Sequence, residues 1–220
     1  MWDVRFRFPF SWLVAGGSGC GKTTKVLNFI KHHKQMTNNP TCDNIVYYYN
    51  QWQEAYNSPE LKKAGVKWVQ GLPTLEKIKS DTYVSKDTGS IIVIDDFAHV
   101  AGKDILELFT VYAHHGNCSC IFLSQNLFDK NPVFRQISLN STYISVFKNP
   151  RDKMQINAFA KQIHPTNSKF VIESFLEATK KPFSYMLFDN HQMTPDQLRI
   201  RSRILPDEAP MIIWMDKTNT

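Results

Sequence analysis

Short apolar runs alternate with segments of helical periodicity along this chain of 220 residues. Apolar or β-branched runs predict strands over residues 10–15, 44–49, 66–69, 90–94, 118–125, 142–147 and 185–188. Apolar residues at helical spacing predict helices over residues 24–30, 52–63, 74–78, 104–113, 150–162 and 168–180. This alternation is typical of an α/β fold, in which helices cover both faces of a mostly parallel central sheet.

The pattern also suggests how the chain is divided. It shows no internal repeat, no low-complexity segment and no long linker, so we expect a single domain over residues 1–220. Its core would span about 9–188. Residues 189–220 would form a C-terminal strand or tail, irregular except for an alternation at 199–203 that is typical of an exposed strand.

Composition and charge limit the partners and the cellular compartment that we expect for this chain. The formal net charge of +6 and the pI near 9.1 are compatible with a polyanionic partner, and equally with a generally basic solvated surface. No apolar run approaches the ~20 residues that span a membrane. We find no secretory leader, and the four cysteines show no disulfide-framework spacing. We therefore expect a soluble intracellular protein with reduced thiols and no membrane partner.

The strand at 10–15 and the helix at 24–30 flank a glycine-rich turn. Its sequence, GGSGCGKT, fits the G-x-x-x-x-G-K-[ST] pattern without a mismatch. Such a turn directs backbone N–H groups at a phosphate; Lys22 would reach the β- and γ-phosphates, and Thr23 would bind Mg²⁺. ATP and Mg²⁺ are therefore the predicted cofactors. The predicted nucleotide-binding residues are Gly16, Gly17, Ser18, Gly19, Cys20, Gly21, Lys22, Thr23 and Thr24.

Two later strands end in polar residues that would complete a hydrolytic site. The strand at 90–94 leads into Asp95 and Asp96. Asp95 would hold Mg²⁺ and Asp96 would act as the general base, although such a pair could also cap the next helix. Gln125 closes the following strand. The order of motifs resembles a branch of P-loop ATPases in which an extra strand separates the strand before the phosphate-binding turn (Walker A) from the strand before the acidic pair (Walker B) and ends in a polar sensor. This resemblance implies that Gln125 is the γ-phosphate sensor; the alternative is an ordinary strand-end glutamine.

With these residues in place, the chain resembles the FtsK/HerA superfamily. It is most similar to genome-packaging ATPases of the poxvirus type and of Polinton/Maverick (adintovirus-like) elements. The resemblance covers about residues 9–205 and is strongest in PFSWLVAG with GCGKT, IVIDDF, FLSQNLF and VFKNPRD. It implies a homo-oligomeric ring, a pentamer or hexamer, that uses ATP hydrolysis to move double-stranded DNA into a preformed capsid. It further implies phosphate-backbone contacts, capsid-protein partners and a place at the site of viral assembly.

The chain departs from this family at one position. Relatives commonly carry an arginine before the Gln-bearing strand, where it would act on a neighbouring subunit's γ-phosphate, whereas this chain has Gly116. Arg151 is the first candidate to replace it, because it is expected to open a helix after a strand; a surface ion pair is the alternative role. Arg135 and the cluster of Arg199, Arg201 and Arg203 are further candidates.

Other interpretations carry less weight. His114, His115, Cys118 and Cys120 crowd together but match no established zinc spacing. The aromatic residues at 47–49, with Trp52 and Tyr56, favour core packing over base stacking. A P-loop nucleotide or small-molecule kinase would need an Arg-rich lid, which is not evident. A nucleotide-regulated DNA-binding or assembly protein that does not hydrolyse ATP stays open because of the missing arginine.

Overall fold

The computed structural model describes residues 3–39, 41–80, 87–95, 97, 102–112, 117–129 and 131–216. Its strands form one sheet of nine, in the order β3-β2-β4-β5-β1-β6-β7-β8-β9. Neighbours from β3 to β6 pair in parallel, and β7, β8 and β9 extend that block by antiparallel pairing. The mostly parallel sheet is thus confirmed. The strands are β1 (Ser11–Ala15), β2 (Asn44–Tyr49), β3 (Lys67–Gln70), β4 (Ser90–Asp95), β5 (Cys118–Ser124), β6 (Tyr143–Phe147), β7 (Tyr185–Asp189), β8 (Ile200–Ser202) and β9 (Ile212–Trp214).

The strand order confirms the predicted extra strand. β5 lies between β1, which leads into the glycine-rich turn, and β4, which ends in the acidic residue. Ala15 pairs with Ser124, and Asp95 pairs with Leu123, so the three strands end at the same level. This register brings the turn, Asp95 and the residue after β5 to one edge of the sheet.

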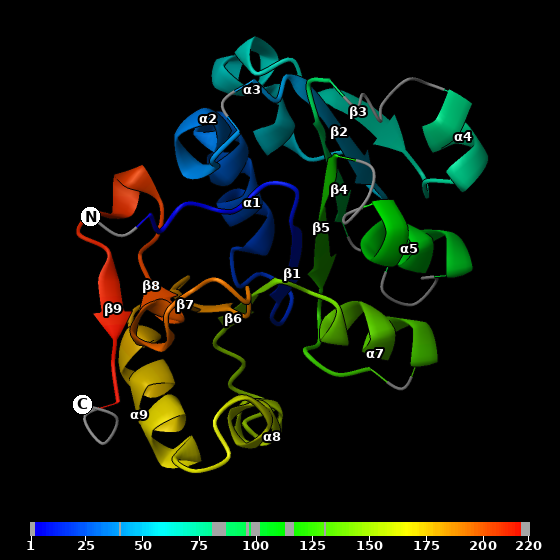
Figure 1. Cartoon of the computed structure of the whole chain (residues 1–220). Helices are drawn as coiled ribbons and strands as arrows, with labels where there is room; N and C mark the ends of the chain where they lie inside the picture. Colours follow the sequence, from blue (N-terminus) through cyan, green and yellow to red (C-terminus); the bar gives the residue numbers. More distant parts are fainter. Residues whose placement is uncertain are drawn as a thin grey trace.

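Helices cover both faces of the sheet (Figure 1). One face packs against α1 (Lys22–Lys31), α2 (His33–Met36) and α3 (Pro59–Lys63). The other packs against α5 (Lys103–Glu107), the π-helical turn η3 (Leu108–Tyr112), α7 (Pro132–Leu139), α8 (Met154–Ile163) and α9 (Ser168–Ala178). The remaining elements are α4 (Leu75–Ser80) and the 3₁₀ turns η1 (Glu54–Asn57), η4 (Asp196–Leu198) and η5 (Pro206–Glu208).

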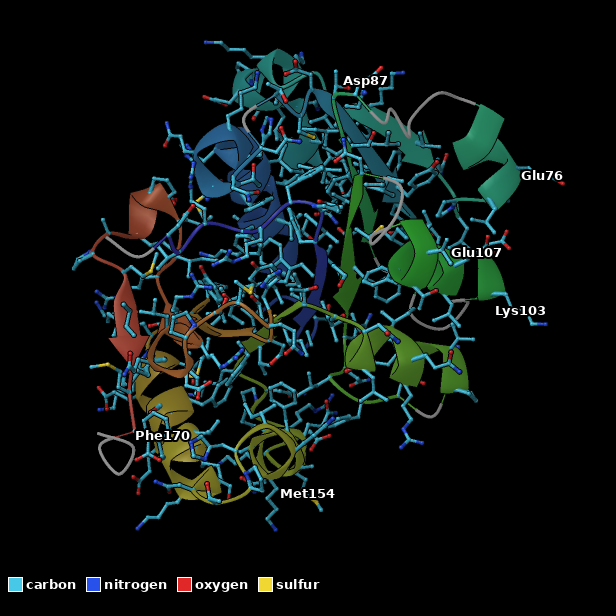
Figure 2. All side chains as sticks on the ribbon, viewed as in Figure 1. Glu76, Asp87, Lys103, Glu107, Met154 and Phe170 are labelled. Carbon is cyan, nitrogen blue, oxygen red and sulfur yellow. The ribbon has the colours of Figure 1, made fainter. Side chains whose placement is uncertain are left out.

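Successive residues of the central strands enter opposite cores. In β1, Leu13 packs toward α7 and α8 while Trp12 and Val14 pack toward α1. Every residue of β1, β4, β5, β6 and β7 is buried, which explains why these strands read as continuous apolar runs. Figure 2 shows side chains filling both cores, with the exposed Glu76 and Lys103 directed outward. Among the described helices, none has the length and apolar character that crossing a bilayer requires.

Three predicted helices have different limits. The helix expected over 52–63 is divided into η1 and α3, because Ser58 is extended before Pro59 and caps α3 by accepting from the Leu61 N–H. The helix expected over 104–113 is α5 followed by η3. Pro150 does not begin α8; the side chain of Asp152 accepts from the Met154 N–H at 3.1 Å and sets the start there.

The C-terminal residues are more regular than predicted. β8 lies between β7 and β9, so residues 199–203 do not form an exposed edge strand. Arg201 is 1% exposed, pairs with the Asp189 carboxylate and donates to the Val4 carbonyl. Its burial removes Arg201 from the candidate trans-acting arginines. The helix α7, which the apolar pattern did not reveal, begins at Pro132 after Asn131 caps it.

Candidate functional site

The glycine-rich turn follows β1 and leads directly into α1. The Gly16 N–H donates to the Ser124 carbonyl at 3.1 Å, which fixes the start of the turn to β5. A Cβ at Gly16 would lie 2.6 Å from the Cβ of Phe147, so no larger residue fits there. Gly19 and Gly21 have φ of +73° and +98°, in the left-handed region that glycine adopts without strain. Three of the motif's glycines are therefore required by the geometry.

Lys22 lies at the first position of α1, and its ammonium group lies across the turn. The Lys22 Nζ donates to the carbonyls of Gly16 and Gly17, at 2.6 and 3.0 Å. The Cys20 thiol is 4.0 Å from the same ammonium, but burial raises its pKa, so it stays protonated at neutral pH. The positive charge of Lys22 is thus held inside the loop of backbone that would receive a phosphate.

Asp95, at the end of β4, faces the glycine-rich turn. One of its oxygens, Oδ2, accepts from the Thr23 hydroxyl at 3.0 Å and from the Tyr47 hydroxyl at 2.6 Å. Burial, and then the charge of Asp95, raise the pKa of Tyr47 well above its ordinary value, so this hydroxyl keeps its proton and donates. Carboxylate and hydroxyl oxygens are the ligands that Mg²⁺ prefers. Thr23 and Asp95 therefore fit the predicted metal site.

A cavity of about 570 Å³ opens between the turn and the ends of β4 and β5. This size is within the range of cavities that hold small ligands. The cavity joins the predicted Ser18, Gly19, Gly21, Lys22, Thr23, Thr24, Asp95 and Gln125 with Lys25, Gln53, Leu123 and Phe183. Lys25 and Leu123 adjoin the motifs and could have been included on that ground. Nothing in the local sequence singles out Gln53 or Phe183. For Tyr47, the apolar run around it predicts core packing and gives no sign of a contact with the site.

Among the described residues, the predicted Gly16, Gly17, Cys20 and Arg151 do not line this cavity. Asp96 and Gly116 lie outside the described residues. Arg151 is exposed in the loop after β6, and its backbone N–H donates to the Asn149 Oδ1 at 3.1 Å. That loop is next to the turn, because a Cβ at Gly17 would lie 3.8 Å from the same Asn149 oxygen. Arg151 is therefore close in the chain to the site without lining it.

The start of α1 is also tied to the C-terminal part of the chain. The Lys25 ammonium forms an ion pair with the Glu208 carboxylate and lies 4.7 Å from the centroid of the Tyr185 ring. The Tyr185 hydroxyl donates to the other Glu208 oxygen at 2.8 Å. Burial, followed by the charge of Glu208, raises the pKa of Tyr185 well above its usual value, which keeps this donor protonated. Residues on α1, β7 and η5 thus hold one another in place beside the cavity.

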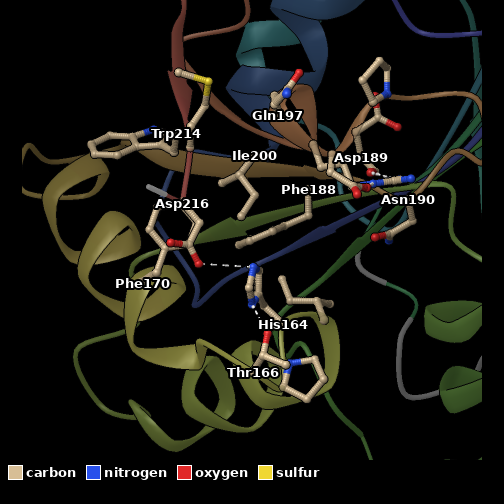
Figure 3. A pocket seen from close by; sticks show the side chains of 16 residues that line it. His164, Thr166, Phe170, Phe188, Asp189, Asn190, Gln197, Ile200, Trp214 and Asp216 are labelled. Carbon is tan, nitrogen blue, oxygen red and sulfur yellow. Dashed lines mark hydrogen bonds and ion pairs between the residues drawn. The ribbon is translucent and has the colours of Figure 1, made fainter. Parts of the chain in front are cut away.

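A larger cavity of about 750 Å³ lies away from the glycine-rich turn, between α8, α9, β7, β8 and β9 (Figure 3). His164 pairs with Asp216 at 3.6 Å, and the Asn167 amide donates to the same carboxylate at 2.8 Å. Arg199, which also lines this cavity, donates to the Asp196 carboxylate and to the Asp189 and His191 carbonyls. Asp189, Asp196 and Asp216 pair with Arg201, Arg199 and His164, so this cavity lacks the excess of positive charge that would favour a phosphate.

The two other candidate clusters are the His and Cys residues at 114–120 and the aromatic residues at 47–56. Cys118 and Cys120 are buried in β5, while His114 and His115 lie outside the described residues. Within the described ranges, no three His, Cys, Asp or Glu side chains are grouped as a metal requires. Tyr47, Tyr48 and Tyr56 are buried, which confirms core packing for these three, and Trp52 is half exposed above them.

Comparison with solved structures supports the fold. The genome packaging NTPase B204 from Sulfolobus turreted icosahedral virus 2, solved with ATP-gammaS, is similar with a TM-score of 0.55 and 13% identity. The similarity covers 94% of this chain and 97% of B204. The cytoplasmic domain of the Type VII secretion ATPase EccC from Thermomonospora curvata has a TM-score of 0.50 and 14% identity, covering 88% of this chain and 26% of EccC.

The sequence itself matches no family model, and it matches no curated protein. At 13–14% identity, the structural similarities show the fold alone. They confirm that this chain has the P-loop NTPase fold, and that the expected resemblance to a viral genome-packaging ATPase holds at the level of the fold.

Proposed function

We propose that this protein is an ATPase that moves double-stranded DNA into a preformed viral capsid. The observation that carries the proposal is the contact of Thr23 with Asp95 across an inserted strand, beside Gln125 in the same cavity. Residues 1–220 would act as one P-loop domain in a homo-oligomeric ring at the site of viral assembly. The similarity to a viral packaging NTPase over 94% of the chain supports this choice among the functions of the fold.

Each residue in and around the cavity would have a separate role in ATP hydrolysis. The backbone N–H groups of the turn and the Lys22 ammonium would bind the β- and γ-phosphates. Mg²⁺, held by Thr23 and Asp95, would neutralise charge on the phosphate oxygens. Gln125 would orient the attacking water, and Asp96 would accept its proton as the water attacks the γ-phosphate. Tyr47 would fix the Asp95 carboxylate through their 2.6 Å hydrogen bond.

Arg151 is the proposed source of the positive charge that a neighbouring subunit would contribute. It is exposed, as a residue must be to reach another subunit, and Lys148 and Lys153 are exposed in the same loop. An arginine in this role accelerates hydrolysis by about 10³-fold or more. DNA would be held through its phosphates by exposed basic residues, since packaging must proceed on any sequence. Capsid proteins would be the docking partner of the ring.

Phosphate release by the purified oligomer with Mg²⁺ and ATP, with and without linear duplex DNA, tests the proposal. We expect DNA to stimulate release and the Lys22→Ala variant to abolish it. Release equal to that of Lys22→Ala would refute the motor and leave a non-hydrolysing nucleotide-binding protein. Transfer of the phosphate to a small acceptor would instead identify a kinase.

Mixing Arg151→Ala subunits with wild-type subunits tests the trans role. An arginine that acts on a neighbour lowers the activity of mixed rings more than in proportion to the fraction of variant subunits. Arg135→Ala, which changes the exposed arginine on α7, tests the next candidate in the same way; if Arg151 is the trans residue, Arg135→Ala should show simple proportionality. Proportional loss with Arg151→Ala would remove it from this role.

A further inference from the structure

Phe183 occupies a tight turn between α9 and β7. The Ser184 N–H donates to the Lys181 carbonyl at 3.4 Å, so residues 181–184 form a β-turn with Pro182 in its second position. Phe183, in the third position, has a φ of +61°. Turns with Pro second and a positive φ third normally carry Gly or Asn there, because a Cβ is strained in this region. Phenylalanine is therefore an unfavourable choice for the turn itself.

Packing does not compensate for this strain. The Phe183 side chain is 67% exposed, which makes it one of the most exposed large apolar side chains in the described part of the chain. The strained backbone raises the free energy of the folded state, and the exposed ring gains no burial energy that would offset this cost. Such a combination is typical of functional residues, and it requires an explanation from outside the fold.

The ring lies beside the start of α1. A Cβ at Gly21 would lie 3.4 Å from the Cβ and Cδ1 of Phe183, and Phe183 lines the same cavity as Lys22 and Asp95. Gly21 directly precedes Lys22 in the phosphate-binding turn. An aromatic ring is thus placed at the border of the phosphate site, on a different segment from the residues that would bind Mg²⁺ and phosphate.

We propose that Phe183 is the stacking platform for the base of the nucleotide. This inference rests on the proposed function, because it places the base of the triphosphate that the turn would bind. The cavity of about 570 Å³ has room for a whole nucleotide. Stacking recognises the π-face that every base has, so a platform of this kind does not depend on the hydrogen-bonding groups of one base. The ligand class is therefore a nucleoside triphosphate, and GTP should bind as well as ATP at this subsite.

Binding measurements with and without the base test the proposal directly. For Phe183→Ala we expect Mg-ATP to bind roughly tenfold more weakly, the usual effect of losing one aromatic stacking partner. The affinity for Mg-tripolyphosphate, which has no base, should stay within about twofold. Phe183→Tyr, which keeps the ring, should restore ATP binding. Met193→Ala, which truncates another exposed apolar side chain (71% exposed) outside the cavity, is the control and should leave both affinities unchanged.

Phe183→Gly separates a binding role from a structural one. Glycine suits the positive φ, so this variant should unfold at the same temperature as wild type or higher, while it still loses ATP affinity. Equal weakening of ATP and tripolyphosphate, or unchanged ATP affinity with weaker subunit assembly, would overturn the base platform. A different result would contradict the proposed function: if Lys22→Ala bound tripolyphosphate as tightly as wild type, the glycine-rich turn would not be the phosphate site.

Discussion

Two cavities of comparable size lie toward opposite strand ends of the same sheet. The smaller, about 570 Å³, opens where β1, β4 and β5 end, and the larger, about 750 Å³, adjoins Asp189 at the end of the antiparallel β7. Asp189 pairs with Tyr143, the first residue of β6, so the larger cavity lies at the amino ends of the parallel strands. The open α/β sheet offers its ligand site at the carboxyl ends.

The chemistry of the two linings separates them more clearly than their volumes do. The smaller cavity contains Lys22, Lys25 and the backbone of the glycine-rich turn, with Asp95 on the opposite side. The larger contains Asp189, Asp196 and Asp216, and its Arg199 is already bound to protein oxygens. Only the smaller cavity combines lysines with the glycine-rich turn at the start of a helix, the arrangement that binds phosphate. The comparison teaches that this backbone arrangement, and not volume, identifies a phosphate site.

Replacing one carboxylate in each cavity should give the largest contrast. Asp95→Asn removes the charge that would hold Mg²⁺, so we expect ATP turnover to fall by at least about 100-fold. Asp216→Asn weakens the contact with His164 and should cost about 1 kcal/mol of unfolding free energy while turnover stays within twofold. Phosphate release and thermal unfolding measure both. A large loss of turnover with Asp216→Asn would show that the two cavities work together.

Removing one hydrogen bond from each cavity gives a finer contrast. Tyr47→Phe deletes the hydroxyl that donates to Asp95. Loss of a hydrogen-bond partner of a metal ligand typically lowers metal affinity or activity by about tenfold, and we expect a decrease of this size. Trp214→Phe deletes the indole donation to the Ser202 hydroxyl at 3.0 Å, and it should lower stability by about 1 kcal/mol with unchanged turnover. A Mg²⁺ titration of ATPase activity is the decisive measurement. If the Mg²⁺ requirement of Tyr47→Phe matched wild type, Tyr47 would have no positioning role.

The sequence predicts the smaller cavity well because each of its parts is a short continuous segment of the chain. The glycine-rich turn, the buried strands and the polar residues at their ends are all visible in the order of residues. Once β1, β4 and β5 are taken as parallel, Thr23, Asp95 and Gln125 must meet at one edge. The position of the extra strand does not follow from the alternation; it is expected from the resemblance to P-loop ATPases with an inserted strand, and the strand order agrees with that expectation.

The parts that escape prediction depend on contacts between distant segments. Nothing near Phe183 reveals that its turn lies against Gly21, and Glu208 meets Lys25 only because η5 packs on α1. The alternation at 199–203 predicts an exposed edge strand, and the sequence does not show that β9 pairs with β8 along that edge. Arg201 is buried, where it contacts Asp189 and the Val4 carbonyl of the N-terminal segment, and the ion pair with Asp189 compensates its charge.

Glu208 offers the smallest and most specific test, because the C-terminal residues reach both cavities. Glu208 holds Lys25 beside the nucleotide site, while Asp216 holds His164 in the other cavity. Glu208→Gln keeps the acceptor for Tyr185 but loses the charge, so we expect about 1 kcal/mol less stability and a KM for ATP changed by no more than about threefold. Glu173→Gln, in an exposed pair with Lys169, should change neither quantity. If Glu208→Gln reduced turnover as severely as Asp95→Asn, the Lys25–Glu208 pair would belong to the hydrolytic machinery, and the boundary of the nucleotide site would have to include the C-terminal segment.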